Sequence, residues 1–540
     1  MAYIIGISGG FRQGNLDPSA ILLKDGELIA GVEEERLNRI KHSPGFIPRR
    51  SINFCLSNAN IKIRDVDYVA YHHSTYEGTE EELKNYFIYN FGMSPKIVCV
   101  NHHEAHAACS YFLSDFKEAN IITIDFSGDN ICTTLNTAVQ NQIKREVSYK
   151  TPNSLGIFYS IITQYLGFQI LTDEYKVMGL SAYGKQDKSI ENSFADILKV
   201  NHDSYEFNQE YFKEGSSLQQ SLFSNKLIEL FGDNRKDHEK ITQRHMDIAY
   251  GAQRVFERGC ESLLNYLSSR FSTKNLCLSG GASMNCVMNS VLLSSKKVKD
   301  IFIPNCPGDS GNSIGAAYSL ANRIGVKIKK NKSPFIGPSF SNQEIKRDLE
   351  KIKLNYQFLE ETDLISFVAQ EINNGKIIGW LQGKAEFGPR ALGNRSILAS
   401  PLDPNMKDKI NSNIKFREGF RPFAPSVIME EADKYFKNIY PTPYMNLTFE
   451  VKVDYLHAIT HVDKSARVQT VTEDYNPLYY KLIKKFGEIT GVPVILNTSL
   501  NIMGQPIVCT PKEALTVFGA TGMDILVLGN YVLKKSANSN

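Results

Sequence analysis

The feature that most constrains the fold of this 540-residue chain is a short apolar stretch followed at once by glycine, serine and aspartate. It occurs in YIIGIS at 3–8, in NIITIDFSGD at 120–129 and in NLCLSGGASMN at 275–285. Buried strands that end in small polar loops and alternate with helices predict an α/β fold with ligand loops at the carboxyl ends of the strands. A hairpin that turns at KDGE is predicted within 19–35. No repeat at a fixed period is evident.

The length predicts two or three domains. The stretch 327–342, KIKKNKSPFIGPSFSN, is basic, unpatterned and contains proline and glycine, so we place a boundary there and expect domains 1–335 and 336–540. A helix is expected directly after it, capped by Ser341 or Asn342.

Composition excludes several classes of protein. A net charge of +3 implies no polyanion, so neither nucleic acid nor a membrane is an expected partner. No run approaches the ~18 to 20 apolar residues of a membrane span, and the first residues lack a signal peptide, which predicts a cytoplasmic protein. Nine scattered cysteines without a C-x-x-C pair predict reduced, mostly buried thiols.

Histidines cluster in NHHEAHAA at 101–108. His102 and His106 are four residues apart, so on a helix both face one side and could share a metal ion. The metalloprotease signature H-E-x-x-H is absent, and solvated histidines at a helix start are the alternative. Asp125 at a strand end and Asp309 in PGDSGNS would add two carboxylates. Such a set suits iron, manganese or magnesium better than structural zinc.

Two further features predict anion binding. In LSGGASMN, Gly280 and Gly281 would let backbone N–H groups approach a phosphate or ribose, although many ordinary turns look similar. Between Trp380 and Pro425 there are eight Lys or Arg against four Asp or Glu, interleaved with glycine and proline. Guanidinium groups on such loops suit phosphate or carboxylate recognition, with nucleic acid as the weaker alternative.

The ordered motifs of the chain resemble those of one enzyme family. They are DPSA, EEERLNRIKH, HHEAHAA, SLGIFYS, EYKVMGLSAYG, SGGASMN, PGDSGNSIGAA, EFGPRALGNRSILASP, FRPFAPSV, ARVQTV and LNTSLN. Together they resemble the O-carbamoyltransferases of the nodulation and antibiotic-biosynthesis type. The resemblance implies an actin/sugar-kinase-like (ASKHA) N-terminal domain, like the tRNA threonylcarbamoyltransferase. It implies an α/β twisted-sheet C-terminal domain like the threonylcarbamoyl-adenylate synthase (YrdC-like).

The resemblance also implies the reaction and its components. Carbamoyl phosphate and ATP would form carbamoyl adenylate, and the carbamoyl group would pass to a hydroxyl of a small-molecule or sugar acceptor. The expected cofactor is one divalent metal ion, Fe²⁺ before Mn²⁺ or Mg²⁺, and a homodimer is a further possibility. The alternatives are a tRNA-modifying enzyme, a small-molecule kinase of the actin-like fold, and a non-enzymatic nucleotide sensor.

Residue roles follow from the matching motifs. The implied metal ligands are His102, His106, Asp125 and Asp309. The implied nucleotide contacts are Gly128, Gly280, Gly281, Asn285, Arg395 and Asn497. The residues expected to hold carbamoyl phosphate and the ATP phosphates are Arg390, Lys415, Arg421, Arg467 and Ser499. On the acceptor side the candidates are Asp17, Glu34 and Lys41, one of which would act as general base.

Overall fold

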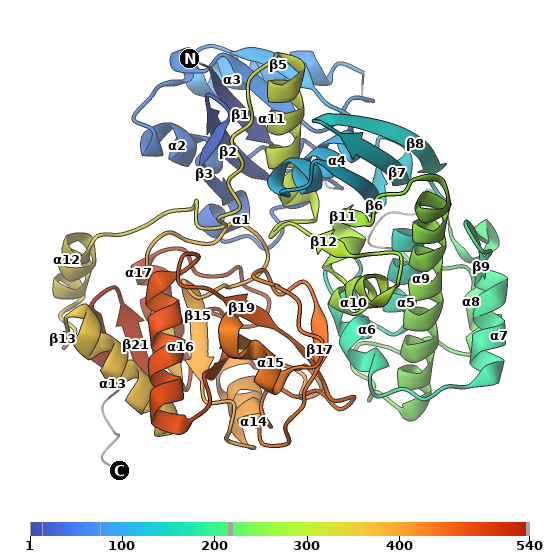
Figure 1. Ribbon diagram of the computed structural model, residues 1–540. Coiled ribbons are helices and arrows are strands. Elements are labelled where there is room, and N and C mark those ends of the chain that lie inside the picture. The colour runs from blue at the N-terminus through green and yellow to red at the C-terminus, as the bar shows by residue number, and fades with distance from the viewer. Residues whose placement is uncertain (1, 13, 76, 214–219, 536–540) are drawn as a thin grey trace. The chain divides into compact units, whose positions relative to one another are not determined.

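The computed structural model describes residues 2–12, 14–75, 77–213 and 220–535 (Figure 1). The chain divides into two compact units. The first contains residues 1–33 and 43–332, and the second contains residues 34–42 and 333–540. The division after Lys332 lies close to the boundary expected near residue 335. The assignment of 34–42 to the second unit was not expected.

The first unit contains two five-stranded sheets with the same topology. In the first sheet the order is β3-β2-β1-β4-β5, and in the second it is β8-β7-β6-β11-β12. In each, three successive strands form an antiparallel meander. Two later strands then add in parallel beside the first strand of the meander. This duplicated order is that of the actin and sugar-kinase fold, as the sequence motifs implied.

The sequence showed no repeat because the two copies carry different connections. In the first copy the helices α1 and α2 and a short turn separate β3 from β4, whereas in the described residues the helices α5 to α9 and a two-stranded sheet lie between β8 and β11. The strands of the first unit are β1 Tyr3–Ile7, β2 Ser19–Lys24, β3 Glu27–Glu33, β4 Tyr68–Tyr71, β5 Lys96–Cys99, β6 Glu118–Gly128, β7 Ile131–Val139, β8 Gln142–Lys150, β9 Leu198–Val200, β10 Tyr205–Phe207, β11 Asn275–Ser279 and β12 Asp300–Phe302.

Helices cover both sheets of the first unit, and α11 packs against both α4 and β1 (Figure 1). Gly315 and Gly6 allow this close packing, because a Cβ on Gly315 would lie 1.8 Å from the carbonyl oxygen of Ala105 and one on Gly6 would lie 1.9 Å from that of Ser313. The helices are α2 Arg49–Asn58, α3 Thr79–Phe91, α4 His102–Leu113, α5 Leu155–Tyr165, α6 Glu174–Ser181, α7 Lys188–Ile197, α8 Asn225–Phe231, α9 Gln243–Arg270, α10 Cys286–Ser294 and α11 Asn312–Arg323.

The second unit is built on one mixed eight-stranded sheet of order β13-β22-β21-β14-β15-β20-β16-β19. Ser341 caps its first long helix in a capping box with Glu344, as predicted. Its elements are α1 Glu34–Asn38, α12 Asn342–Ile352, β13 Gln357–Phe358, α13 Glu361–Asn373, β14 Ile378–Leu381, β15 Arg395–Ala399, α14 Met406–Ile410, β16 Ala424–Ile428, α15 Ala432–Tyr435, β17 Thr448–Glu450, β18 Ser465–Arg467, β19 Gln469–Val471, α16 Pro477–Thr490, β20 Val494–Ser499, α17 Pro511–Ala520, β21 Ile525–Leu528 and β22 Tyr531–Lys534.

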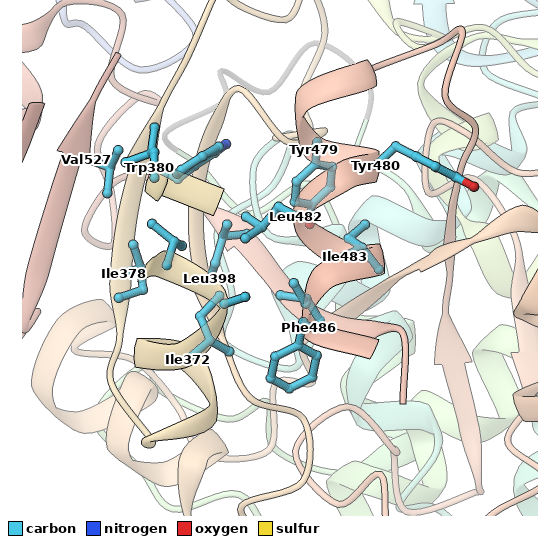
Figure 2. Packing of buried hydrophobic residues seen from close by; sticks show 14 of the residues in the cluster. Ile372, Ile378, Trp380, Leu398, Tyr479, Tyr480, Leu482, Ile483, Phe486 and Val527 are labelled. Carbon is cyan, nitrogen blue, oxygen red and sulfur yellow. The ribbon is translucent and has the colours of Figure 1, made fainter. Parts of the chain in front are cut away.

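The core of the second unit lies between its sheet and the paired helices α13 and α16 (Figure 2). The only tryptophan of the chain, Trp380 on β14, is fully buried there, and its indole N–H donates to the carbonyl oxygen of Gly393 at 2.9 Å. Tyr479 and Phe486 extend from α16 toward the sheet. Burying such large side chains stabilises the fold by about 1.5 to 3 kcal/mol each.

The segment Glu34–His42 completes this second unit although it follows β3 in the sequence. The Arg36 guanidinium donates to the carbonyl oxygen of Gly388 at 2.8 Å. Arg39 donates to the carbonyl oxygens of Ile507 at 2.7 Å and Pro506 at 2.8 Å. The acidic and basic run EEERLNRIKH, which also reads as a solvated strand end, is therefore largely structural and partly buried.

Candidate metal centre

Helix α4 places two imidazoles on the same face. Asn101 caps the helix by accepting the N–H of Glu104, so His102 is the first helical residue and His106 lies one turn later. Both side chains are fully buried, and their Nε2 atoms are 3.1 Å apart. The alternative of solvated histidines at a helix start is therefore wrong.

Two carboxylates converge on these nitrogen atoms. Asp125 lies near the end of β6, where a register irregularity interrupts the pairing with β7, and its Oδ2 is 3.0 Å from both Nε2 atoms. Asp309 begins the short turn before α11, and its Oδ1 is 3.5 Å from His102 Nε2 and 3.4 Å from His106 Nε2. The structure thus brings all four residues singled out as metal ligands to within 4.8 Å of one another.

The electrostatics of the cluster favour a cation. Burial lowers the pKa of His106, but the hydrogen bond to Asp125 and the charges of Asp125 and Asp309 outweigh it and raise the pKa to about 9. Burial raises the pKa of Asp125, and the two histidines lower it well below its usual range. The buried Oδ1 of Asp309 accepts no hydrogen bond from any residue in the described part of the chain. Two nitrogen and two oxygen donors around one point therefore fit a divalent ion.

A second layer of residues, which the sequence reasoning missed, orients His102. Asp129 accepts the backbone N–H of His102 at 2.8 Å and the Asn101 side chain at 3.0 Å. Gly9 N–H donates to Nε2 of His72 at 3.2 Å, so a neutral His72 carries its proton on Nδ1, which lies 3.3 Å from His102 Nδ1. The sequence contains a pattern that could have identified these residues. The HH of YVAYHHST and the second aspartate of DFSGD each follow an apolar strand, as the predicted metal ligand Asp125 does.

The glycine loops surround the same cluster. A Cβ on Gly128 would lie 2.2 Å from the His102 ring, and one on Gly280, where φ is +92°, would lie 2.2 Å from the carbonyl oxygen of Ile124. The N–H of Gly281 points to Asp125 Oδ1 at 3.4 Å. These glycines let the strand ends and α4 approach one another. Asn285 caps α10 and also donates to Gln253 at 2.9 Å.

In the second unit, Lys415 and Ser499 come together. Lys415 is buried in a π-helical turn, and its ammonium donates to the Ser499 carbonyl, to Ser499 Oγ at 3.3 Å, and to the carbonyl and side-chain oxygens of Asn501 at 3.1 and 2.8 Å. Burial, followed by repulsion from Arg417 and Arg421, holds the pKa of Lys415 well below its usual value. Asn501, which the sequence reasoning did not select, completes this group.

Family models match both units of the chain. A model of the carbamoyltransferase N-terminus matches residues 4–94 and 91–318, and a model of the carbamoyltransferase C-terminus matches residues 369–535. The chain belongs to the carbamoyltransferase family. The resemblance stated from the motifs is thereby confirmed.

Two relatives of this carbamoyltransferase have functional names, and a third is an uncharacterized protein. The nodulation protein NolNO of Sinorhizobium fredii is 35% identical over 97% of this chain and 79% of its own length. The 3'-hydroxymethylcephem-O-carbamoyltransferase of Amycolatopsis lactamdurans is 33% identical over 47% of this chain and 48% of its own. An uncharacterized protein of Synechocystis is 36% identical over 99% of this chain and 97% of its own.

Among solved structures, the ROK hexokinase of Thermus thermophilus covers 60% of this carbamoyltransferase and all of its own chain, at 11% identity and a TM-score of 0.30. The HypF protein of T. kodakarensis covers 60% of this chain and 48% of its own, at 12% identity and a TM-score of 0.33. TM-scores this low do not establish a common fold, so the fold class is assigned from the strand order of the two sheets in the first unit. Within the described residues, no helix has both the length and the apolar character that crossing a membrane requires.

Two predicted nucleotide contacts in the carbamoyltransferase have structural roles instead. Arg395 is fully buried, and its guanidinium donates to the carbonyl oxygens of Pro338 at 2.9 Å, Cys509 at 3.1 Å and Gln382 at 2.5 Å. Asn497 is also buried and donates to Gln469 Oε1 at 3.0 Å. Every Arg in a basic run looks alike in sequence, but Arg395 begins β15 and points into the interior.

Four other residues with predicted roles in substrate binding are partly exposed to solvent. Arg390 and Arg467 are half-buried, and the half-buried Arg421 lies 3.6 Å from Glu418. Asp17 is half-buried in the first unit, where its backbone carbonyl accepts the Ser8 hydroxyl at 3.0 Å.

The remaining acceptor-side candidates belong to the second unit. Lys41 donates to both carboxylate oxygens of Glu35, at 3.2 and 3.1 Å, and Glu34 is buried. Burial raises the pKa of Glu35, but the charges of Arg36 and Lys41 outweigh this and lower it to about 2. Lys41 is therefore held in an ion pair.

Proposed function

We propose that this carbamoyltransferase is an ATP-dependent O-carbamoyltransferase. Carbamoyl phosphate is hydrolysed to carbamate and phosphate, and a carbamate oxygen then attacks the α-phosphorus of ATP to give carbamoyl adenylate and pyrophosphate. An acceptor hydroxyl next attacks the carbamoyl carbon, the bond from that carbon to the phosphate oxygen breaks, and AMP leaves with release of a proton. The family and the named O-carbamoyltransferase relative support this choice.

The observation that carries the proposal is the convergence of His102, His106, Asp125 and Asp309. A divalent ion held there, Fe²⁺ before Mn²⁺ or Mg²⁺, would polarise the carbamoyl oxygen and stabilise the departing phosphate. The surrounding residues keep the ligands in place. Asp129 holds the start of α4, and Gly128 and Gly280 leave room for the strand ends beside it. The same glycine loops, with Asn285, are the proposed contacts of the adenylate.

The first step is assigned to the basic loops of the second unit. The ammonium of Lys415 donates its hydrogen bonds to Ser499 and Asn501, so Lys415 orders the chain segment from Ser499 to Asn501. The guanidinium groups of Arg390, Arg421 and Arg467 are then the cations proposed to hold carbamoyl phosphate and the triphosphate. Bringing two polyanions together requires such charges, which contribute through positioning and electrostatic stabilisation.

The test is exchange of labelled pyrophosphate into ATP in the presence of carbamoyl phosphate. The wild-type chain is expected to catalyse this exchange without any acceptor. Arg390→Ala should lower the exchange rate by about 10² to 10³, the usual effect of losing one preorganised charge contact. Arg347→Ala, an exposed arginine on α12, is the matched control and should exchange at the wild-type rate. Absence of exchange in the wild-type protein loaded with metal would refute the proposed reaction.

A second arm separates the two steps. His102→Ala is expected to retain exchange and to lose carbamate-ester formation, because its side chain belongs to the cluster assigned to transfer. If this variant, with its folding verified by circular dichroism, lost exchange as completely as Arg390→Ala, then adenylate formation would also depend on the metal cluster. Adenylate formation and carbamoyl transfer would then take place at a single shared site.

A further inference from the structure

The loop of the second unit that follows β14 and ends at β15 is folded around one carboxylate, and this loop carries Arg390. The buried side chain of Glu386 accepts three backbone N–H groups on its Oε1 atom, from Leu392 at 2.8 Å, Asn394 at 2.7 Å and Arg395 at 3.2 Å. Hydrogen bonds to a carboxylate are stronger than those between neutral groups. Three of them on one oxygen therefore fix the course of the chain from Leu392 to Arg395.

Buried side chains from three other segments of the second unit hold backbone carbonyls beside Arg390. The donors and the carbonyls that accept from them are Arg36 to Gly388 at 2.8 Å, Asn497 to Ala391 at 3.3 Å and Gln469 to Leu392 at 2.9 Å. Pro389, directly before Arg390, adds a backbone angle that its ring fixes. The backbone is thereby held on both sides of Arg390, whose own side chain is half-buried.

Such a loop suits a residue that must present its charge in one place. A cation stabilises phosphate oxygens most effectively when it is held in position before the reaction, and a long side chain can be held only if its backbone is fixed. The sign of the charge on Glu386 points to the same role. A carboxylate in contact with carbamoyl phosphate would repel this anion, but Glu386 is buried and its Oε1 is directed at backbone N–H groups.

We propose that Glu386 is a positioning residue of the carbamoyl phosphate site. It fixes the loop between β14 and β15, and the loop fixes the guanidinium of Arg390. The inference rests on the proposed function, because Arg390 is assigned there to the phosphates of the substrates. It also gives Arg36 and Asn497 a part in the same site, since both hold carbonyls of this loop.

The first test is a double-mutant cycle on pyrophosphate exchange. Glu386→Ala is expected to lower kcat/KM for carbamoyl phosphate by about 10- to 100-fold, the usual effect of removing a residue that orients a binding group. In the Arg390→Ala background the same change should cost less than about threefold, because residues that act through one another do not have additive effects. Equal losses in the two backgrounds would show that Glu386 acts independently of Arg390, and the inference would be wrong. Failure of exchange in the wild type is a different result, and it would refute the proposed function.

Two conservative variants and one control sharpen the cycle. Glu386→Gln keeps an acceptor oxygen for the three N–H groups, so it should retain at least about ten times the exchange of Glu386→Ala, and equal exchange by the two would contradict the inference. Glu386→Asp withdraws the carboxylate by one carbon–carbon bond, and it replaces Glu386→Ala in the cycle if the alanine variant does not fold. Glu344→Ala is the matched control, because Glu344 also accepts a backbone N–H, that of Ser341 at 2.8 Å, but on α12. It should exchange at the wild-type rate.

Trp380 provides a second readout that does not depend on turnover (Figure 2). It is the only tryptophan of the chain, and its indole N–H donates to the carbonyl of Gly393 in this loop at 2.9 Å, so its fluorescence reports on the loop. The emission should shift in Glu386→Ala and remain at the wild-type position in Glu386→Gln and Arg390→Ala. An unchanged spectrum in a folded Glu386→Ala variant with reduced exchange would show that Glu386 does not hold the loop, and it would overturn the inference.

Discussion

The affinity of the centre for a divalent ion should rise steeply between pH 6.5 and pH 9. Without metal, His106 is protonated over this range, because its pKa is raised from 6.5 to about 9 beside Asp125 and Asp309. A metal can bind Nε2 only after that proton leaves. Below pH 9 the ion therefore competes with a proton that the two carboxylates hold in place.

The size of the effect follows from the same shift. Between pH 6.5 and pH 9, removing the proton from His106 costs about 1.4 kcal/mol for each pH unit below the pKa of about 9. The apparent affinity for the divalent ion should therefore rise by roughly 3 kcal/mol, or about 300-fold, over this range. The stability of the metal-free protein should move in the opposite direction. A group whose pKa is raised on folding stabilises the fold fully below its unfolded pKa, and this contribution is lost as the pH rises through the folded pKa. The metal-free protein should thus lose up to about 3 kcal/mol between pH 6.5 and 9.

The measurement is a Mn²⁺ titration against a competing fluorescent chelator at half-unit steps from pH 6 to 9.5, with urea unfolding of the metal-free protein in parallel. Glu104→Gln is the control, because Glu104 is on the same helix but pairs with Arg323 rather than with the cluster. It should reproduce the wild-type pH profile. An affinity that is flat from pH 6.5 to 9 in the wild type would show that His106 holds no competing proton, and the electrostatic argument would be wrong.

Three further results are expected. Arg395→Met should destabilise the protein by about 3 to 5 kcal/mol in urea unfolding, because several buried carbonyls lose a charged donor, whereas Arg390→Met should change stability little; equal stability of the two would contradict the structural role of Arg395. Gly128→Ala should push the His102 ring away and weaken Mn²⁺ binding about 10 to 100-fold, and unchanged binding would show that the ring adapts freely. Lys415→Met should lower pyrophosphate exchange by about 10² to 10³ as the Ser499 turn loses its donor, and exchange within twofold of wild type would remove this turn from the site.

The sequence by itself determined the local elements and the family. The apolar stretches before small polar loops became strands, Asn101 capped a helix that aligns His102 with His106, and Ser341 capped the helix after the boundary. These features depend on periodicity and on capping groups within a few residues, so they can be read directly along the chain. The ordered motifs further identified a carbamoyltransferase, which the family models confirm.

Only the tertiary structure decided which distant residues meet. It brought Asp125 and Asp309 next to the imidazoles of His102 and His106. It placed Asp129 and His72 in contact with His102. It also showed that Arg395, predicted as a nucleotide contact, is buried and binds backbone carbonyls. It also assigned Glu34–His42 to the second unit and revealed the duplicated sheet order. Contacts of this kind arise from strand pairing and packing across long stretches of sequence, and they minimise the free energy of the whole chain. No local pattern of charge or periodicity specifies them, because the same residue types serve equally well in a ligand loop or in the interior.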